Sequence, residues 1–288
     1  MTEFGRYGVW VSGRSWPTDP NEIALAAQEL ESLGYGSVWI GGSPPDDLDL
    51  PEAILSATSR LVVGTSVIDV WRSDPVALSA SHARIRNHFP DRFFLGLGSG
   101  HAPAVEATGQ EYVRPISRLR SFAESLSTPA SARLFGALGP RALEAARDAS
   151  AGALPYLVPP AHTADARRIL GPDRLLIPEQ KIFIGTDETE ARAVGRRGTG
   201  SYLALPNHVN ALRRYGLTDA DFAGHGSDRW VDTLVVWGDE ERVRKGVTAH
   251  LEAGADHVAV QALSAVTHGR LPLAEWRAAA EILMPSVQ

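Results

Sequence analysis

The first residues whose types could do chemistry form the run Gly96-Leu97-Gly98-Ser99-Gly100-His101, which ends an apolar, strand-like stretch. Glycines at a strand end let the backbone approach a flat ligand closely. His101 adds a side chain that titrates near neutral pH. The same run is also typical of a tight strand-to-helix turn with a histidine in solvent. The run is therefore a candidate ligand site, and its function depends on which residues lie beside it in the fold.

A second run, Gly136-Ala137-Leu138-Gly139-Pro140-Arg141, leads from a predicted strand directly into a predicted helix. Proline is favoured in the first turn of a helix, where backbone N–H groups have no partner within the helix. Those free groups, with the guanidinium of Arg141 beside them, are suited to bind a phosphate group. The spacing differs from that of dinucleotide-binding and P-loop motifs. A helix that is simply well terminated would show the same pattern.

A third strand end, Gly64-Thr65-Ser66-Val67-Ile68-Asp69, combines a glycine with small hydroxyl side chains. Such residues permit a bulge, which could lie beneath a flat ring. Alone, the segment also fits an ordinary core strand. Among the tryptophans, Trp10 and Trp71 could flank an aromatic ligand, whereas we expect Trp39 to pack in the core.

Eight apolar runs must position these strand ends, and helical periodicity separates nearly every run from the next. Alternating strands and helices predict a parallel sheet, and eight repeats predict an α/β fold of the (β/α)8 TIM-barrel type. The carboxyl ends of its strands meet at one face, which would bring the three runs together. A doubly wound open sheet is the competing architecture. The predicted strands are Tyr7–Ser12, Gly36–Ile40, Leu61–Val67, Arg92–Leu97, Arg133–Leu138, Leu154–Val158, Lys181–Gly185 and His257–Ala262.

We expect a single domain over residues 1–288, because no compositional break divides the chain. The stretch 198–237 is longer and less regular than one barrel connection needs. We interpret this stretch as an irregular insertion, helical in part, that lies near the mouth of the barrel or at an oligomer contact.

Composition and charge argue against several classes of function. A net charge of -6 without a basic stripe is unlike a nucleic-acid-binding protein. The absence of cysteine removes catalytic thiols and cysteine-ligated metals, and the histidines show no metal-binding spacing. No serine-hydrolase motif is present. Since no run approaches the ~20 apolar residues of a membrane span and Met1–Gly8 is unlike a signal peptide, we expect a cytoplasmic enzyme without metal, nucleic-acid or membrane partners.

Taken together and in their order, these strand ends resemble those of the luciferase-like (LLM class) flavin and deazaflavin oxidoreductases. The similarity extends over nearly the whole chain and points to a subfamily of probable coenzyme F420-dependent oxidoreductases. The segments that carry it are LGLGSGHAP (Leu95–Pro103), FGALGPRALEAA (Phe135–Ala146), LPYLVPPAHTADARRILGP (Leu154–Pro172), YLALPNHVNALRRYG (Tyr202–Gly216) and AHLEAGADHVAVQAL (Ala249–Leu263).

The resemblance implies a barrel whose flavin-like ring lies across the strand ends, with the phosphate tail at the turn after the fifth strand. Related proteins commonly have a non-proline cis peptide under the ring, which would fall at Ser66-Val67. The resemblance makes His101 the catalytic proton donor and lets Arg141 and His162 hold the phosphate or polyglutamate tail. The implied cofactor-binding residues are Ser66, Val67, Gly98, Ser99, Gly100, Ala137, Leu138, Gly139, Pro140, Arg141 and His162.

The function implied is hydride transfer between coenzyme F420 and an unidentified small organic substrate, in a homodimer. An FMN-dependent luciferase-like monooxygenase is one alternative. A non-catalytic flavin- or deazaflavin-binding relative is another. It is motivated by the end of the second strand, where many related proteins carry an acidic or histidine side chain and this chain has Gly41-Gly42.

Overall fold

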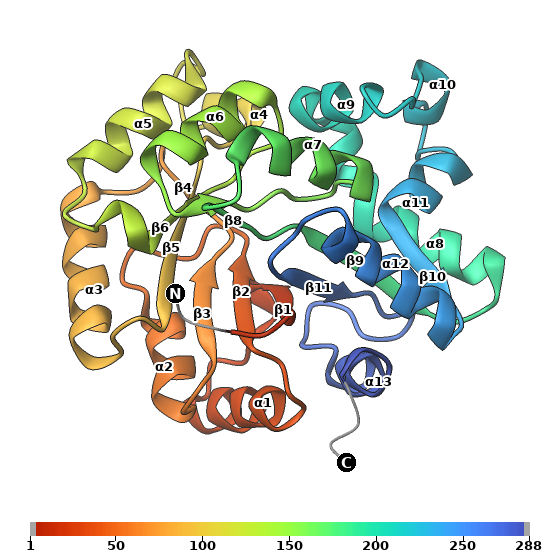
Figure 1. Ribbon diagram of the computed structural model, residues 1–288, viewed down its shortest axis with the longest axis horizontal. Coiled ribbons are helices and arrows are strands. Elements are labelled where there is room, and N and C mark those ends of the chain that lie inside the picture. The colour runs from red at the N-terminus through yellow and green to blue at the C-terminus, as the bar shows by residue number, and fades with distance from the viewer. Residues whose placement is uncertain (1–3, 285–288) are drawn as a thin grey trace.

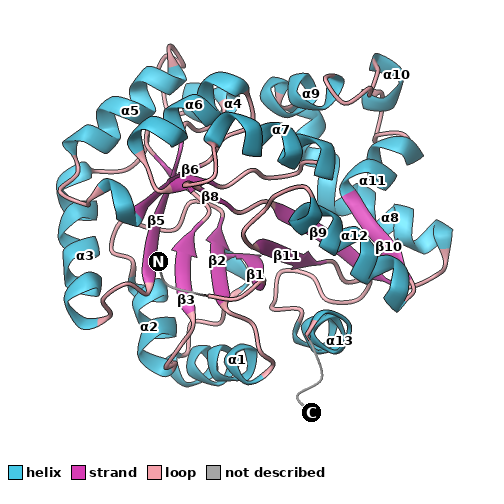
Figure 2. Ribbon diagram, in the orientation of Figure 1, coloured by secondary structure: helices cyan, strands magenta, loops and turns pink. Residues whose placement is uncertain are grey.

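The computed structural model describes residues 4–284, in which parallel strands are surrounded by helices (Figures 1 and 2). The predicted domain span also includes residues 1–3 and 285–288, which lie outside the described residues. The strands are β1 (Tyr7–Ser12), β2 (Ser37–Gly41), β3 (Val62–Thr65), β4 (Ile68–Asp69), β5 (Phe93–Gly98), β6 (Arg133–Phe135), β7 (Gly152–Ala153), β8 (Leu175–Leu176), β9 (Glu179–Ile184), β10 (Val235–Gly238) and β11 (Val258–Ala262).

Several helices begin at an aspartate whose side chain accepts a hydrogen bond from a first-turn N–H group, as at Asp19, Asp74, Asp187 and Asp239.

Within residues 4–284 no helix is long and apolar enough to span a bilayer. The α-helices are α1 (Pro20–Ser32), α2 (Asp49–Ala57), α3 (Pro75–His88), α4 (Ala102–Glu106), α5 (Pro115–Ser125), α6 (Pro140–Ala149), α7 (Pro160–Leu170), α8 (Glu188–Thr199), α9 (Pro206–Arg213), α10 (Asp219–Phe222), α11 (Asp228–Leu234), α12 (Glu240–Glu252) and α13 (Leu273–Leu283), with 3₁₀ turns η1 (Gly13–Ser15), η2 (Ala130–Ala132) and η3 (Gly200–Ala204).

One extended segment, residues 175–184, closes the sheet into a barrel. The strand order is β10-β9-β11-β1-β2-β3-β5-β6-β7-β8, with β4 beside β5. Within the segment, β8 pairs with β7, and β9 pairs with β11. Hydrogen bonds from Ile177 N to Ala153 O (3.0 Å) and from Ala259 N to Pro178 O (2.9 Å) join it to both neighbours. The predicted barrel fold is therefore confirmed, and the open sheet is excluded.

One predicted strand was wrong in position, and three strands were not predicted. The sixth strand is Gly152–Ala153 rather than Leu154–Val158, because Leu157 has a positive φ of 59° and its N–H group donates to the Glu179 side chain. The strands not predicted are the two-residue strands β4 and β8, and β10. Strand β10 pairs with the edge of β9 away from β11, and its short apolar run directly follows α11 without a turn residue to mark its start.

The stretch 198–237 contains η3, α9, α10 and α11 before it ends in β10. In Figure 1 its cyan helices lie together on one side of the barrel. Its apolar residues form a separate cluster around the fully buried Trp230, whose Nε1 donates to Thr199 Oγ1 (2.9 Å). Trp39, by contrast, is fully buried inside the barrel, as predicted.

Three histidines outside the strand-end face are buried between elements. His82 lies against Phe93, and His257 bonds Ser37 Oγ (2.8 Å). His250 lies between Thr163 Oγ1 (2.7 Å) and Gln180 Oε1 (2.9 Å). Burial lowers the pKa of each of the three from 6.5 to about 4, so all three imidazoles are neutral at pH 7.

We expect the free energy of unfolding to decrease as the pH falls from about 6.5 towards 4. The unfolded chain binds protons at its histidines below pH 6.5, whereas the folded chain does so near pH 4, so acid favours unfolding. Urea unfolding at a series of pH values measures this dependence. His82→Phe should weaken the dependence, and the same change at the exposed His225 should not. Stability that is constant or rises between pH 7 and 5 would contradict the assignment.

Candidate functional site

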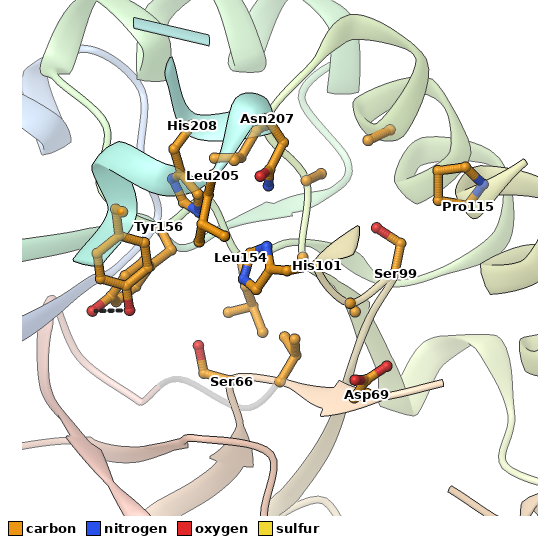
Figure 3. A pocket seen from close by; sticks show the side chains of 18 of the residues that line it. Ser66, Asp69, Ser99, His101, Pro115, Leu154, Tyr156, Leu205, Asn207 and His208 are labelled. Atoms are coloured by element: carbon orange, nitrogen blue, oxygen red, sulfur yellow. Dashed lines mark hydrogen bonds between the residues drawn. The ribbon is translucent and has the colours of Figure 1, made fainter. Parts of the chain in front are cut away.

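The three predicted strand ends meet at one cavity of about 1270 Å³ (Figure 3). It lies where β3, β5 and β6 end, and residues of the stretch 198–237 complete its wall. The structure therefore brings together all of the predicted catalytic and cofactor-binding residues except His162. Those in the wall are Ser66, Val67, Gly98, Ser99, Gly100, His101, Ala137, Leu138, Gly139, Pro140 and Arg141.

The floor of the cavity is the backbone between β3 and β4. The peptide bond Ser66-Val67 is cis, as predicted. A Cβ atom at Gly98 would lie 2.1 Å from Val67 Cγ2, so only glycine allows β5 to pass beneath that side chain. Gly136 faces the same valine at ordinary contact distance. Val67 and the two glycines thus form a mostly apolar surface at the floor of the cavity.

A tryptophan takes the space at the end of β2, where the chain has Gly41-Gly42. A Cβ atom at Gly41 would lie 2.0 Å from the Trp10 ring, so the indole excludes any larger residue there. Trp10 lines the cavity and donates from Nε1 to Ser66 Oγ (3.0 Å). Trp71 lies outside the cavity wall and donates to Ser99 O (2.8 Å), which supports the loop instead.

One end of the cavity can bind an anion. The helix α6 begins at Pro140 after Gly139, and no side chain caps its first N–H groups. Arg141 is exposed there, and Arg214 lies opposite, with Nη1 3.6 Å from where a Cβ atom at Gly139 would be. Among the described residues neither guanidinium forms a salt bridge. Arg214 lies in the segment Tyr202–Gly216 but was not predicted as a site residue; it follows α9 and is brought here by the fold.

His162 is placed differently from the prediction. Its side chain is buried behind the turn, where the ring packs against Tyr215 and Nε2 donates to Leu138 O (2.8 Å). It does not line the cavity. The correction follows from helix α7, whose first turn directs His162 towards the back of the turn, so it supports the anion-binding end without reaching a ligand.

His101 faces the middle of the cavity beside a second imidazole. Burial lowers the pKa of His101, opposed by the Asn207 amide and the Asp69 carboxylate. The ring of His208 lies 5.6 Å away, and burial lowers its pKa to about 3. Both imidazoles have a buried Nδ1 without a hydrogen-bond partner among the described residues. Two such nitrogens at one wall indicate a place for a polar ligand group.

The other end of the cavity is aromatic and hydroxyl-rich. Trp10, Tyr156, Tyr202 and Gln261 line it, and the ring of Tyr156 lies 4.9 Å from Trp10 and 5.3 Å from Tyr202. Behind this wall, Lys181 lies in β9. Lys181 was the sequence signal that could have identified this end of the cavity, because a lysine is unusual in a strand that is predicted to be buried. Among residues 4–284 no three His, Asp or Glu side chains gather as a metal ion would require.

We expect Gly98→Ala to destabilise the fold by about 1–3 kcal/mol, because the new methyl group would overlap Val67. Denaturant unfolding measures the change. Gly200→Ala is the matched control, since nothing lies within 4 Å of its added Cβ. Equal stability of the two variants would show that the close approach of Val67 to β5 is incorrect.

Comparison with known proteins agrees with this architecture. The F420-dependent tetrahydromethanopterin reductase from Methanopyrus kandleri superposes with a TM-score of 0.73 at 17% identity, over 96% of each chain. An F420-dependent secondary alcohol dehydrogenase, in complex with an F420-acetone adduct, has a TM-score of 0.67 at 15% identity, covering 96% of this chain and 98% of that one. A type II Baeyer-Villiger monooxygenase of Pseudomonas putida in complex with FMN has a TM-score of 0.66 at 13%, over 96% of each.

Similar sequences are found among F420-dependent glucose-6-phosphate dehydrogenases. That of Tsukamurella paurometabola is 34% identical over 117 residues, 35% of each protein. That of Mycolicibacterium gilvum is 39% identical over 103 residues, 33% of this chain and 31% of the relative. The matches thus span about a third of these relatives. A family model described as luciferase-like monooxygenase matches residues 5–257. The chain therefore belongs to the luciferase-like monooxygenase family.

Proposed function

We propose that this protein is an F420-dependent oxidoreductase that transfers a hydride between the deazaflavin and a small organic substrate. One observation carries the proposal: a single cavity joins an apolar floor at Val67 to an anion-binding end at Arg141 and Arg214. A planar ring with a phosphate-bearing tail has these same two requirements. The F420-dependent relatives among the sequence matches support the choice of cofactor.

The residues present fit such a cofactor. Ser66, Val67 and Gly98 would lie under the ring, and the start of α6 with Arg141 and Arg214 would hold the phosphate. Glycine at 98 leaves the room that the Val67 side chain needs to lie beneath such a ring. A bound deazaflavin supplies a carbon that carries a hydride and reacts poorly with oxygen. The protein itself must orient the two reactants, exclude water and exchange one proton.

His101 is the proton donor expected from the sequence. Its imidazole lines the cavity, and the lowered pKa keeps it neutral at pH 7, with one N–H donor and one acceptor nitrogen. It can therefore hydrogen bond a reacting oxygen. The kinetics of His101→Gln measure how much of the proton exchange depends on this side chain.

We also propose that the protein is a homodimer in the cytoplasm and binds no nucleic acid. Sedimentation of the pure protein measures its oligomeric state.

An FMN-dependent monooxygenase is the second candidate, favoured by the family and by the FMN-containing neighbour of the same fold. Its cofactor would use the same floor and the same anion-binding end. Oxygen consumption with supplied reduced FMN distinguishes the two functions. A non-catalytic flavin- or deazaflavin-binding protein is the third candidate. It is less supported, because the packing of the Trp10 ring explains why the residue at the end of β2 is glycine.

We expect F420 to bind saturably in an absorbance titration, and more tightly than FMN. Arg141→Gln and Arg214→Gln should each weaken binding about tenfold, or about 1.4 kcal/mol, because each removes one charge from the anion-binding end.

Arg213→Gln is the control, since Arg213 is adjacent in sequence but pairs with Asp219. Binding of neither cofactor would overturn the proposed function. Tighter binding of FMN with oxygen consumption would replace it with the monooxygenase.

A further inference from the structure

One of the chain's two lysines, Lys181, is completely buried inside the barrel. Its ammonium donates to Tyr156 Oη (2.8 Å), Gln261 Oε1 (3.0 Å) and Glu179 Oε1 (3.1 Å). It also lies 4.1 Å from the centroid of the Tyr156 ring. All three of its donors therefore have partners, and two of those partners line the cavity.

Glu179 and Lys181 form a buried ion pair on the inward face of β9. Glu179 is 3% exposed, and its second oxygen accepts from Leu157 N (3.1 Å). Burial raises the pKa of Glu179 and lowers that of Lys181, and each charge opposes the shift of the other. Such a pair contributes little net stability, because both charges lose their hydration. Stability alone thus does not account for its place behind the cavity wall.

Hydrogen bonds connect this ion pair to the cavity through two phenols. Tyr156 Oη accepts from Lys181 and also from Tyr202 Oη, which is 3.2 Å away. The dashed line at Tyr156 in Figure 3 marks the bond between the two hydroxyls. Tyr202 belongs to η3, so the stretch 198–237 supplies the end of this path. Tyr156 Oη itself donates to Gln261 Oε1 (3.1 Å). For a proton to pass from Lys181 to the cavity, the Tyr202 hydroxyl turns towards the cavity and the Tyr156 hydroxyl turns towards Tyr202, and both rotations are open to a hydroxyl group.

His101 has no comparable supply of protons. Its neighbour His208 is itself neutral, and Asp69 acts on His101 through its charge alone. Among the described residues no hydrogen bond joins either imidazole to an acid. Tyr202, in contrast, is two hydrogen bonds away from a buried ammonium. The ring of Tyr202 lies 5.3 Å from that of Tyr156 and 4.9 Å from that of His208, which is uncharged at pH 7. Lys181 Nζ lies 5.8 Å from the centre of the Tyr202 ring, and its charge is paired with Glu179. The wall at this end is therefore aromatic and uncharged, which suits an uncharged molecule with one polar oxygen.

We propose that the substrate is a compact carbonyl compound, or the corresponding alcohol, whose oxygen binds Tyr202 Oη, and that Lys181 supplies the proton through Tyr156. The proposal rests on the proposed function, because reduced deazaflavin provides the hydride. The hydride adds to the carbonyl carbon, the C=O π bond breaks, and its electron pair moves to oxygen. Tyr202 gives its proton to that oxygen, takes one from Tyr156, and Tyr156 takes one from Lys181. Lys181 is left neutral beside Glu179 and regains a proton from water after the product leaves; alcohol oxidation is the reverse.

The experiment follows the reoxidation of reduced F420 with a panel of short aldehydes and ketones. Tyr202→Phe, Tyr156→Phe and Lys181→Met should each lower kcat about 100-fold or more, the scale of a lost proton donor, while KM changes less than about threefold. Tyr35→Phe and Lys245→Met are matched controls, because the Tyr35 hydroxyl bonds Trp276 O far from the cavity and Lys245 is exposed. The F420 dissociation constant should be the same in all variants.

The pH dependence separates a proton path from a structural role. In the wild type, carbonyl reduction should decline at alkaline pH, where the network has lost its proton. Tyr156→Phe should remove this dependence because Tyr202 is then disconnected from Lys181. His101→Gln should keep the alkaline decline and lower kcat less than about tenfold.

A readout independent of activity tests whether Glu179 and Lys181 are charged. Either Glu179→Gln or Lys181→Met leaves one buried charge unpaired, so each should lower the urea midpoint more than the double variant does. Additive effects would mean that Lys181 does not store a proton and would overturn the proposal. This measurement uses the unliganded protein, so it stands even if a single variant is too unstable for kinetics.

Several outcomes overturn the proposal while leaving the proposed function intact. One is F420 binding without turnover of any carbonyl in the panel. Another is a Tyr202→Phe variant with kcat within about threefold of the wild type while His101→Gln is inactive, which would return the proton to His101. Absence of F420 binding, in contrast, would overturn the proposed function itself.

Discussion

The closure of the barrel by residues 175–184 is the interaction on which the rest of the structure depends. The first part of this segment pairs with β7 and the second with β11, so the two ends of the sheet meet there. Closure brings the ends of β3, β5 and β6 around a single cavity. The same segment carries Glu179 and Lys181 on its inward face, which places a buried ion pair directly behind the cavity wall.

Close approaches between large side chains and glycines on adjacent strands shape the cavity and the interior beneath it. The Trp10 ring occupies the space beside Gly41, Trp39 that beside Gly64, and Val67 that beside Gly98. In each case a Cβ atom on the glycine would lie within 2.5 Å of the partner side chain. Since strands in a barrel cannot separate without breaking hydrogen bonds, the glycines provide the room. This packing also explains why β2 ends without a polar side chain at the cavity.

The two ends of the cavity differ in their electrostatics. At the start of α6, exposed guanidinium groups and free N–H groups attract an anion. At the tyrosine end the wall is formed by uncharged side chains, and Glu179 and Lys181 behind it form an ion pair. Neutral imidazoles lie between the two ends. A ligand with an anionic tail and a neutral reacting partner would match this division.

The sequence by itself determined the repeated strand–helix pattern, the barrel and most of the cavity wall. Hydrophobic periodicity, turn residues and glycine-rich strand ends are local signals that can be read along the chain. It also located the cis peptide at Ser66-Val67 through resemblance. Only the tertiary structure decided that His162 lies behind the turn, that Arg214 joins Arg141, and that Lys181 reaches Tyr202 through Tyr156. These relations join residues distant in the chain, and the direction of a side chain depends on how its strand or helix packs against others.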